Sequence, residues 1–227
     1  MPFKKNYKRK YRRKKRSYGT GTAIAGASTT PVPKRMLVKA RYCDAIVLNA
    51  PNSGTAHHTF CANGIFDPDQ TGTGHQPLGH DQWSQFYEKY TVLGSKITAE
   101  FISAENGSTA VGTVGISLTE NTAFSPSLTE LRERGDNCWG MLGSFDGKNA
   151  SRKLSKTCSV KKWKGIKNLL NEDRLMGECT SANPAEQLHF QVWQSAVRGT
   201  DDPGACEVLI TLEYIIMYHT PIQVSGS

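Results

Sequence analysis

Hydrophobic and polar residues alternate along much of the chain from Met36 onward. In the segment 206–219, CEVLITLEYIIMYH, six apolar side chains fall on one face of an extended chain: Val208, Ile210, Leu212, Tyr214, Ile216 and Tyr218. A period of two is typical of a strand with one buried face. The segments 36–49 and 91–103 follow the same alternation. The pattern therefore predicts three long strands.

Shorter segments with the same period predict further strands. They are 57–64, 111–119, 138–143, 151–160 and 188–197. Together with the long ones they make eight strands, joined by connections of very unequal length. Strands of this number, with few helices between them, favour an all-β fold, a single eight-stranded jelly-roll sandwich.

Helical signals are short and lie between strands. Asp81 could cap a turn in which four aromatic residues follow helical spacing: Trp83, Phe86, Tyr87 and Tyr90. We interpret these aromatics as packing residues, although stacking on bases or a place at an interface also fits them. Ser127 and Glu130 form a capping box ahead of Leu131. We expect both helices to decorate loops.

Charge divides the chain into three sections: a basic arm at 1–18, a flexible Gly/Thr/Ala-rich tether at 19–35, and a globular body at 36–227. Residues 1–41 hold 14 Lys and Arg and no acid, whereas residues 42–227 hold the other 14 together with all 20 Asp and Glu. The arm is therefore the source of the basic balance, and the body is the part that can fold around a core.

The arm is too highly charged to fold alone, because its like charges repel one another. A polyanion relieves that repulsion, since each neutralised phosphate releases a counterion. We expect the arm to bind nucleic acid, DNA or RNA alike, through ten residues: Lys4, Lys5, Lys8, Arg9, Lys10, Arg12, Arg13, Lys14, Lys15 and Arg16. Its densest part, Arg9 to Arg16, is also expected to serve as a nuclear localisation signal. Membrane-surface binding is less favoured, because the arm lacks an apolar face.

The cysteines predict neither a disulfide framework nor a zinc site. Six of them lie far apart with no metal-ligand spacing: Cys43, Cys61, Cys138, Cys158, Cys179 and Cys206. We expect mostly free, buried thiols in a reducing compartment. The arm is not followed by an apolar stretch, so we expect no signal peptide, and the longest apolar run is too short to insert in a membrane.

Catalytic and cofactor motifs find no support. The glycine-rich stretch 71–81, TGTGHQPLGHD, lacks the Lys and hydroxyl of a P-loop and the third glycine of a dinucleotide fingerprint, so we interpret it as a structural turn. Four histidines and three aspartates near it match no metal-ligand spacing: His57, His58, His75, His80, Asp67, Asp69 and Asp81. No nucleophile has a suitable neighbour. We expect no enzyme activity, no metal and no cofactor.

The segment 60–98, FCANGIFDPDQTGTGHQPLGHDQWSQFYEKYTVLGSKIT, resembles the capsid proteins of circovirus-like viruses, which have small circular single-stranded DNA genomes and encode a replication initiator beside the coat. Three parts carry the resemblance: Phe60–Asp69, Thr71–Pro77 and Tyr87–Ile97. It is specific over these residues and architectural elsewhere. Arms in that family are often almost pure arginine, whereas this one mixes Lys and Arg.

The resemblance implies a single jelly roll that assembles with itself into an icosahedral shell of about sixty copies, the T=1 arrangement. It also implies a single-stranded DNA genome held by the arm, a virion location, and a nuclear stage that needs host import receptors. The host-cell receptor stays open. A nucleic-acid-binding protein that does not assemble, such as a nuclear shuttle factor, is the alternative. An enzyme ranks third.

Overall fold

The structure is a computed structural model of the chain. It describes residues 31–51, 54–104, 110–124, 127–145, 147, 149–198 and 201–223. The chain divides into two units, residues 1–31 and 32–227, and the described residues lie almost wholly in the second. The predicted arm and most of the tether lie outside the described residues, so the section boundaries stay predictions.

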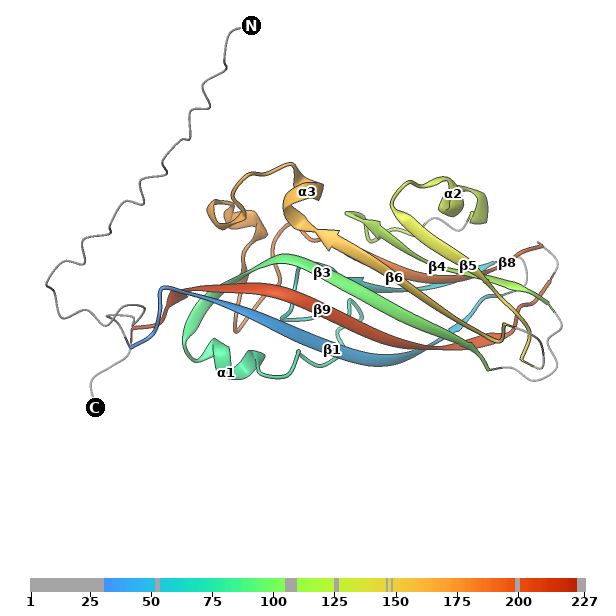
Figure 1. The fold of residues 1–227 in the computed structure, drawn as a ribbon, viewed down its shortest axis with the longest axis horizontal. Helices are drawn as coiled ribbons and strands as arrows, with labels where there is room; N and C mark the ends of the chain where they lie inside the picture. Colours follow the sequence, from blue (N-terminus) through green and yellow to red (C-terminus); the bar gives the residue numbers. More distant parts are fainter. Residues whose placement is uncertain are drawn as a thin grey trace, which may run out of the picture. The chain divides into compact units, whose positions relative to one another are not determined.

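Two antiparallel sheets form the body (Figure 1). The larger follows the order β1-β9-β3-β6, with strands Arg35–Asn49, Ala205–Pro221, Tyr87–Ser103 and Ser151–Ser159; the two-residue strand β7, Gly177–Glu178, also pairs with β3. The smaller follows the order β2-β8-β4-β5, with strands Thr55–Cys61, His189–Ala196, Gly112–Thr119 and Asn137–Leu142. All eight strands predicted from the sequence are present, within a few residues of the expected ends; β7 was not predicted.

The strand order is that of a jelly roll. The first four strands of the chain alternate between the sheets, β5 stays beside β4, and the later strands return to fill the remaining places. Two four-stranded antiparallel sheets connected in this way make the double Greek key of the jelly roll. The predicted fold class is confirmed.

The core lies between the sheets, and β9 supplies its centre. The six apolar side chains predicted to share a face of this strand are each exposed by 1% or less. β1 pairs along its whole length with β9, from Arg35 opposite His219 to Asn49 opposite Ala205, and β3 pairs with the other side of β9. Tyr214 reaches across the core and donates a hydrogen bond to the carbonyl oxygen of Cys61 at 2.7 Å. The alternating pattern therefore identified the buried face correctly.

Strands β4 and β8 are buried on both faces, which simple alternation does not predict. On the outer face, the indole of Trp193 packs against Gly115, where an added Cβ would come 2.2 Å from the ring. Gln191 donates to backbone carbonyls of residues 121–123, so the loop after β4 folds back over this face. Loop packing thus gives the smaller sheet a second buried layer.

Short helices lie in the connections: α1 His80–Ser84, α2 Leu128–Glu133, α3 Val160–Lys164, and two 3₁₀ turns, Leu169–Asn171 and Asp173–Leu175. The predicted cap of α2 is confirmed, because the hydroxyl of Ser127 accepts from the backbone N–H of Glu130 at 3.4 Å. The predicted cap of α1 is wrong. Gly79, with φ of 88°, precedes this helix, and Asp81 lies inside it.

The helical spacing predicted after Asp81 is also wrong. Helix α1 ends at Ser84, and Tyr87 and Tyr90 belong to β3, where both are buried. Phe86, in the turn between α1 and β3, is 45% exposed. The spacing of Tyr87 and Tyr90 is compatible with a helix or a strand. They form a strand because β3 pairs with β9 at both positions.

The cysteines behave as expected within the described residues. All six are free; four are buried, Cys138 is half-buried and Cys43 is exposed. Burial raises the pKa of the Cys61 and Cys206 thiols to about 12, so both are unreactive at neutral pH.

Candidate interaction surfaces

None of the ten arm residues predicted to bind nucleic acid, from Lys4 to Arg16, lies in the described part of the chain. Their predicted roles therefore stay predictions. The described body contains a loop, polar cavities and exposed surfaces that bear on function.

The segment that carries the family resemblance forms a loop closed by side-chain amides. Asn63 is 1% exposed and donates from its amide nitrogen to the carbonyl oxygen of Glu186 at 2.8 Å. Its amide oxygen accepts from the backbone N–H of Leu188, also at 2.8 Å. One side chain thereby joins the loop after β2 to the segment that enters β8. This explains physically why an amide stands at this position.

A second amide, Asn183, holds the same loop from the other side. Its oxygen accepts from the backbone N–H groups of Phe66 and Asp67 at 3.1 and 3.2 Å and from the hydroxyl of Tyr90 at 3.1 Å. Its nitrogen donates to the carbonyl oxygen of Asp67 at 2.7 Å. The Tyr90 hydroxyl in turn accepts from the backbone N–H of Ile65 at 3.1 Å. These motif residues therefore have structural roles.

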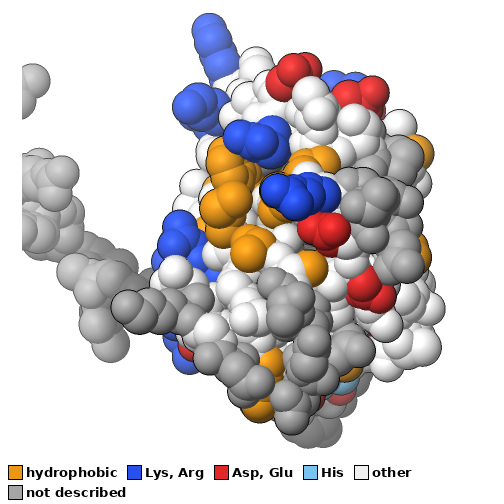
Figure 2. Space-filling model, turned by 90° about the vertical axis from the view of Figure 1, so that its right-hand side faces the viewer, with side chains coloured by type: hydrophobic (Ala, Val, Ile, Leu, Met, Phe, Trp, Pro, Cys, Tyr) orange, Lys and Arg blue, Asp and Glu red, His pale blue; other side chains and the backbone are white. Residues whose placement is uncertain are grey.

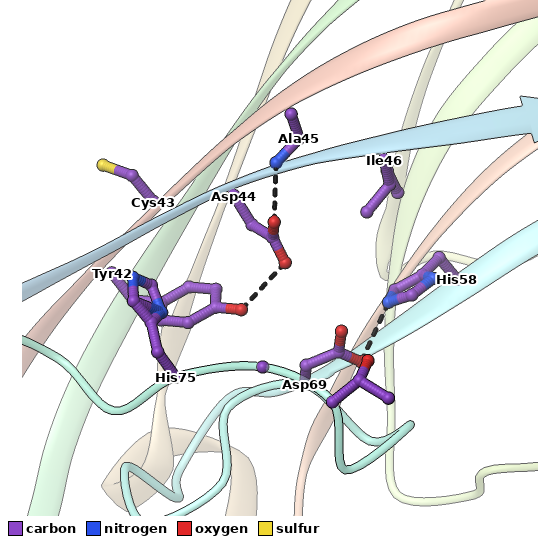
Figure 3. Close-up of a pocket in the computed structure, with 10 residues that line it drawn as sticks. Tyr42, Cys43, Asp44, Ala45, Ile46, His58, Asp69 and His75 are labelled. Atoms are coloured by element: carbon purple, nitrogen blue, oxygen red, sulfur yellow. Dashed lines mark hydrogen bonds and ion pairs between the residues drawn. The ribbon is translucent and has the colours of Figure 1, made fainter.

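A polar cavity of about 430 Å³ lies between β1 and the glycine-rich loop (Figure 3). Tyr42 donates to a carboxylate oxygen of Asp44 at 2.8 Å, and burial, followed by this hydrogen bond, raises the pKa of the tyrosine. Opposite them, His58 Nε2 lies 2.9 Å from Asp69 Oδ1. His75 packs edge-on against Tyr42, with 4.6 Å between ring centroids. The polar side chains that line the cavity contact one another, and these contacts hold the glycine-rich loop against β1.

The histidines considered above as metal ligands are dispersed. His58 and His75 line the cavity, whereas His57 stacks on Phe124 with 4.2 Å between ring centroids. His80 is buried beside Tyr218. In the described ranges, no group of three or more His, Cys, Asp or Glu could hold a metal ion. The described helices also include none long and apolar enough to cross a membrane.

Apolar side chains gather at the end of the body where the β3–β4, β5–β6 and β8–β9 connections lie, and Lys and Arg side chains border them (Figure 2). Val111, Met141 and Val197 are 42%, 55% and 41% exposed. They are neighbours, because Gly112 pairs with both Leu142 and Ala196. Exposed apolar clusters with a polar rim are typical of protein–protein contacts. We call these three residues and Trp139 the apolar end.

Trp139 has a cation over its exposed ring. It lies two residues before Met141 on the same face of β5 and is 38% exposed. The guanidinium carbon of Arg132, from α2, is 4.2 Å from the ring centroid. Such a contact favours an ordered ring on a surface that can bind a partner.

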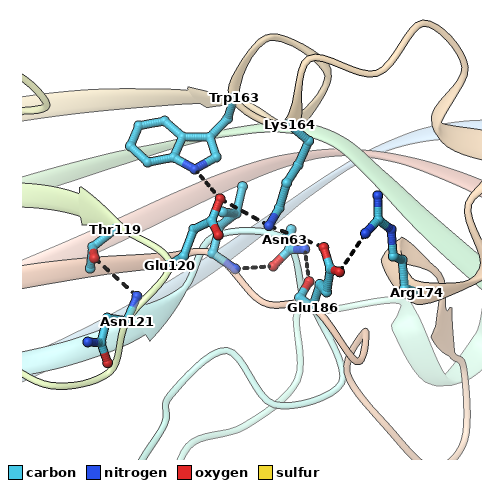
Figure 4. A network of polar contacts seen from close by, with 9 residues as sticks. Asn63, Thr119, Glu120, Asn121, Trp163, Lys164, Arg174 and Glu186 are labelled. Atoms are coloured by element: carbon cyan, nitrogen blue, oxygen red, sulfur yellow. Dashed lines mark hydrogen bonds and ion pairs between the residues drawn. The ribbon is translucent and has the colours of Figure 1, made fainter.

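Helix α3 is fixed to the body by a network of charges (Figure 4). Lys164 Nζ lies 3.0 Å from Glu120 Oε1 and 3.2 Å from Glu186 Oε2, and its side chain is only 11% exposed. The indole N–H of Trp163 donates to the same Glu120 oxygen at 2.8 Å. The hydrogen bond from Lys164 is the main cause that lowers the pKa of Glu120. Arg174 extends the network to Glu186 at 2.8 Å.

No protein-family model matches the chain, and no curated protein sequence does. Among solved structures, the chain is similar to that of tobacco necrosis virus, with 12% identity, 85% of each chain covered and a TM-score of 0.48. It is also similar to a semi-empty virus-like particle of the Macrobrachium rosenbergii nodavirus, with 11% identity, 92% of this chain and 93% of that chain covered, and a TM-score of 0.48. The decameric BFDV capsid protein has 8% identity, 82% of this chain and 99% of that chain covered, and a TM-score of 0.42. The jelly-roll assignment rests on the strand order and not on these likenesses.

A second concentration of positive charge lies within the body and was not anticipated from the sequence. Residues 147–171 contain eight Lys and Arg and no Asp or Glu. Averaging the charge over residues 42–227 concealed this run, because the many acids elsewhere outweigh it. A count of acids in a moving window would have found it. We call residues 147–171 the basic run.

Proposed function

We propose that the chain is a viral capsid protein that assembles with copies of itself into a closed shell and packages nucleic acid, without enzyme activity. The observation that carries the proposal is the joining of an arm with ten cations in its first sixteen residues to a jelly-roll body with an exposed apolar end. A jelly roll suits a wall, because its two-sheet form limits exposed edges. The arm supplies the contact with the packaged polymer.

The proposed cargo is a circular single-stranded DNA genome, bound by the arm residues Lys4 to Arg16. The circovirus-like resemblance of residues 60–98 supports this choice. With ten cations on each arm, sixty arms would neutralise about 600 phosphates. That number suits a small genome whose remaining charge is screened by ions.

The proposed shell is icosahedral, with about sixty copies in a T=1-like arrangement. We propose that neighbouring copies meet through the long connections 65–90 and 121–137, with the apolar end as a further contact. Exposed apolar area is a reason to expect association, since burying it releases water. The proposed location is the virion, preceded by assembly in the host nucleus after recognition of Arg9 to Arg16 by import receptors.

The test is the state of assembly of the full-length protein. We expect uniform spherical particles in negative-stain microscopy and light scattering, and Met141→Asp should prevent them because it places a charge in the apolar end. Val47→Asp is the matched control, since Val47 is 66% exposed on the outer face of β1. A chain that starts near Thr30 should still fold as a β-rich domain. Monomers or dimers alone, across salt concentrations and with DNA present, would favour the non-assembling nucleic-acid-binding protein instead.

A further inference from the structure

The basic run differs in composition from the rest of the body. Its eight cations stand in 25 consecutive residues without an acid, whereas the remainder of residues 42–227 has six cations and all 20 acids. Seven of the eight are Lys. The run therefore forms a local positive surface on a body whose net charge is negative.

In the fold, the run occupies β6, at the edge of the larger sheet, and the helix α3 that follows it directly. Lys153, Lys161, Lys162 and Lys167 are exposed, and Lys156 is half-buried. Figure 1 shows β6 leading into α3 at one margin of the body. The cations therefore lie on adjoining elements, and their electrostatic potentials add over the same part of the surface.

Most of the described cations of the run form no ion pair with a described acid. Among the described residues, no ion pair involves Lys156, Lys161 or Lys162, while Lys153 makes a 3.7 Å contact with an exposed carboxylate of Glu100. An exposed pair of that kind contributes little. Lys164 differs, because its charge is used inside the network of α3. Unpaired like charges repel one another, and a bound anion would relieve that repulsion.

Protection of a sheet edge is the simplest alternative explanation. Lysines on an edge strand discourage pairing with another sheet, and this accounts for Lys153 and Lys156 on β6. It does not account for Lys161, Lys162 and Lys167, which lie beyond the strand. Those three cations need a different reason.

A cavity of about 680 Å³ is lined by two lysines of the basic run, Lys156 and Lys162. Leu118 and Trp163 give it an apolar wall, Lys156 and Lys162 contribute cations, and Ser155 and Thr157 contribute hydroxyls. Asp136 is the one carboxylate among its lining residues, and its oxygens can accept from amino groups. The hydrogen bond to Glu120 fixes the indole of Trp163. The cavity thus combines phosphate-binding groups with a rigid aromatic surface.

The chemistry favours a nucleic acid over other partners. Lys is depleted in the cores of protein–protein interfaces, which argues against an acidic protein surface. A sulfated glycan would use the cations but has no base to place against an aromatic wall, whereas single strands combine phosphates with bases that stack on Trp. Hydroxyls add hydrogen bonds to phosphate oxygens.

We propose that β6, α3 and the adjoining cavity form a second binding surface for single-stranded nucleic acid, separate from the arm. Lysines of the basic run contact phosphates, and Trp163 and Leu118 form the wall against which a base lies. The surface deepens the proposed packaging function and rests on it for the identity of the ligand. It gives the genome a contact on the folded body.

The test measures binding of fluorescent oligo(dT) to the full-length protein across salt concentrations. Lys156→Gln/Lys161→Gln/Lys162→Gln should lower the slope of log affinity against log salt by about 2, from roughly 0.7 per lost phosphate contact. The control Arg35→Gln/Lys89→Gln/Arg198→Gln removes the same charge from residues that do not line this cavity and should change the slope by much less. Equal slopes in the two variants would overturn the proposal.

A second measurement uses the unaltered protein, so it does not depend on the folding of a variant. Acetylation of Lys161 and Lys162, read by mass spectrometry, should fall several-fold when oligo(dT) is bound, while acetylation of Lys89 should change little. Absence of that protection would contradict the proposal, as would a triple variant that weakens binding of a heparin fragment but not of oligo(dT). Protection of these lysines in dispersed subunits would support the second binding surface even if no particles form. A failure of this proposal can therefore be distinguished from a failure of shell assembly.

Discussion

Replacing Asn183 by alanine should detach the loop that carries the family resemblance. The change removes one oxygen that accepts from Phe66, Asp67 and Tyr90 and one nitrogen that donates to Asp67. Tyr90 is fully buried, so its hydroxyl loses an acceptor where water does not enter. The backbone groups of Phe66 and Asp67 are only half-buried, and water can replace part of their loss.

The magnitude follows from these contacts. Four hydrogen bonds at about 1 kcal/mol each set an upper figure of about 4 kcal/mol, and the partial access of water reduces the expected loss in unfolding free energy to about 3 kcal/mol. For a body of this size, 1 kcal/mol corresponds to about 2–4 °C in Tm. Asn183→Ala should therefore lower Tm by about 6–12 °C.

Thermal and urea unfolding of the full-length protein would measure the effect, at a fixed protein concentration and at a salt concentration that keeps the subunits from associating. Asn183→Asp is the matched variant, because it keeps an oxygen acceptor and loses only the donor to Asp67. At neutral pH, the stability of Asn183→Asp should lie between that of the unaltered protein and that of Asn183→Ala. In acid it should approach that of the unaltered protein, because the protonated carboxyl can donate a hydrogen bond. A loss below about 1 kcal/mol for Asn183→Ala would refute this account of the loop.

Four further predictions follow from the charges and the packing. Deleting residues 1–18 should weaken binding of single-stranded DNA severely and flatten its salt dependence, by about 7 in slope for about ten phosphate contacts; an unchanged slope in filter binding would contradict this. A fluorescent protein carrying residues 1–20 should enter nuclei, and fluorescence distributed like that of the unfused control would count against the import signal. His80 donates from Nε2 to the carbonyl oxygen of Cys179, its Nδ1 lies 2.9 Å from the Tyr218 hydroxyl, and burial lowers its pKa. Its unfolded form therefore binds more protons, the free energy of unfolding should fall as the pH drops below 6.5, and urea titrations should show a weaker dependence in His80→Gln. Gly115→Ala should cost about 1–3 kcal/mol because the new Cβ meets Trp193, whereas Gly135→Ala, with open space around it, should not; equal Tm values would disprove the overpacking.

Much of the fold was predictable because its strands have one buried face. The alternation in residues 206–219 identified both the strand and its core side, and the jelly roll followed from the number and spacing of such segments. Helix α2 was predictable because its cap is local, a hydroxyl and a backbone N–H three residues apart. Local signals and a period of two were enough wherever packing agreed with them.

The remaining features depend on contacts between distant residues. Trp193 is buried on the outer face of its sheet because a loop covers it, and alternation cannot show a loop returning. Tyr87 and Tyr90 joined a strand because β9 was available to pair with them. The apolar end needed the register of β4 with β5 and β8 before its residues could be recognised as neighbours. The basic run was visible in the sequence, but its edge position and its cavity were not.

The place of β9 at the centre of the larger sheet affects when the protein can fold. Both β1, which is more than 150 residues earlier in the sequence, and β3 pair with this strand. Until residues 205–221 have been synthesised, those two strands lack their common partner, and contacts so distant in sequence form slowly. Folding must therefore follow translation of the last long strand. The surfaces that we propose for assembly consequently arise only on chains in which β9 has been made, so chains that stop before residue 205 are kept out of the proposed shell.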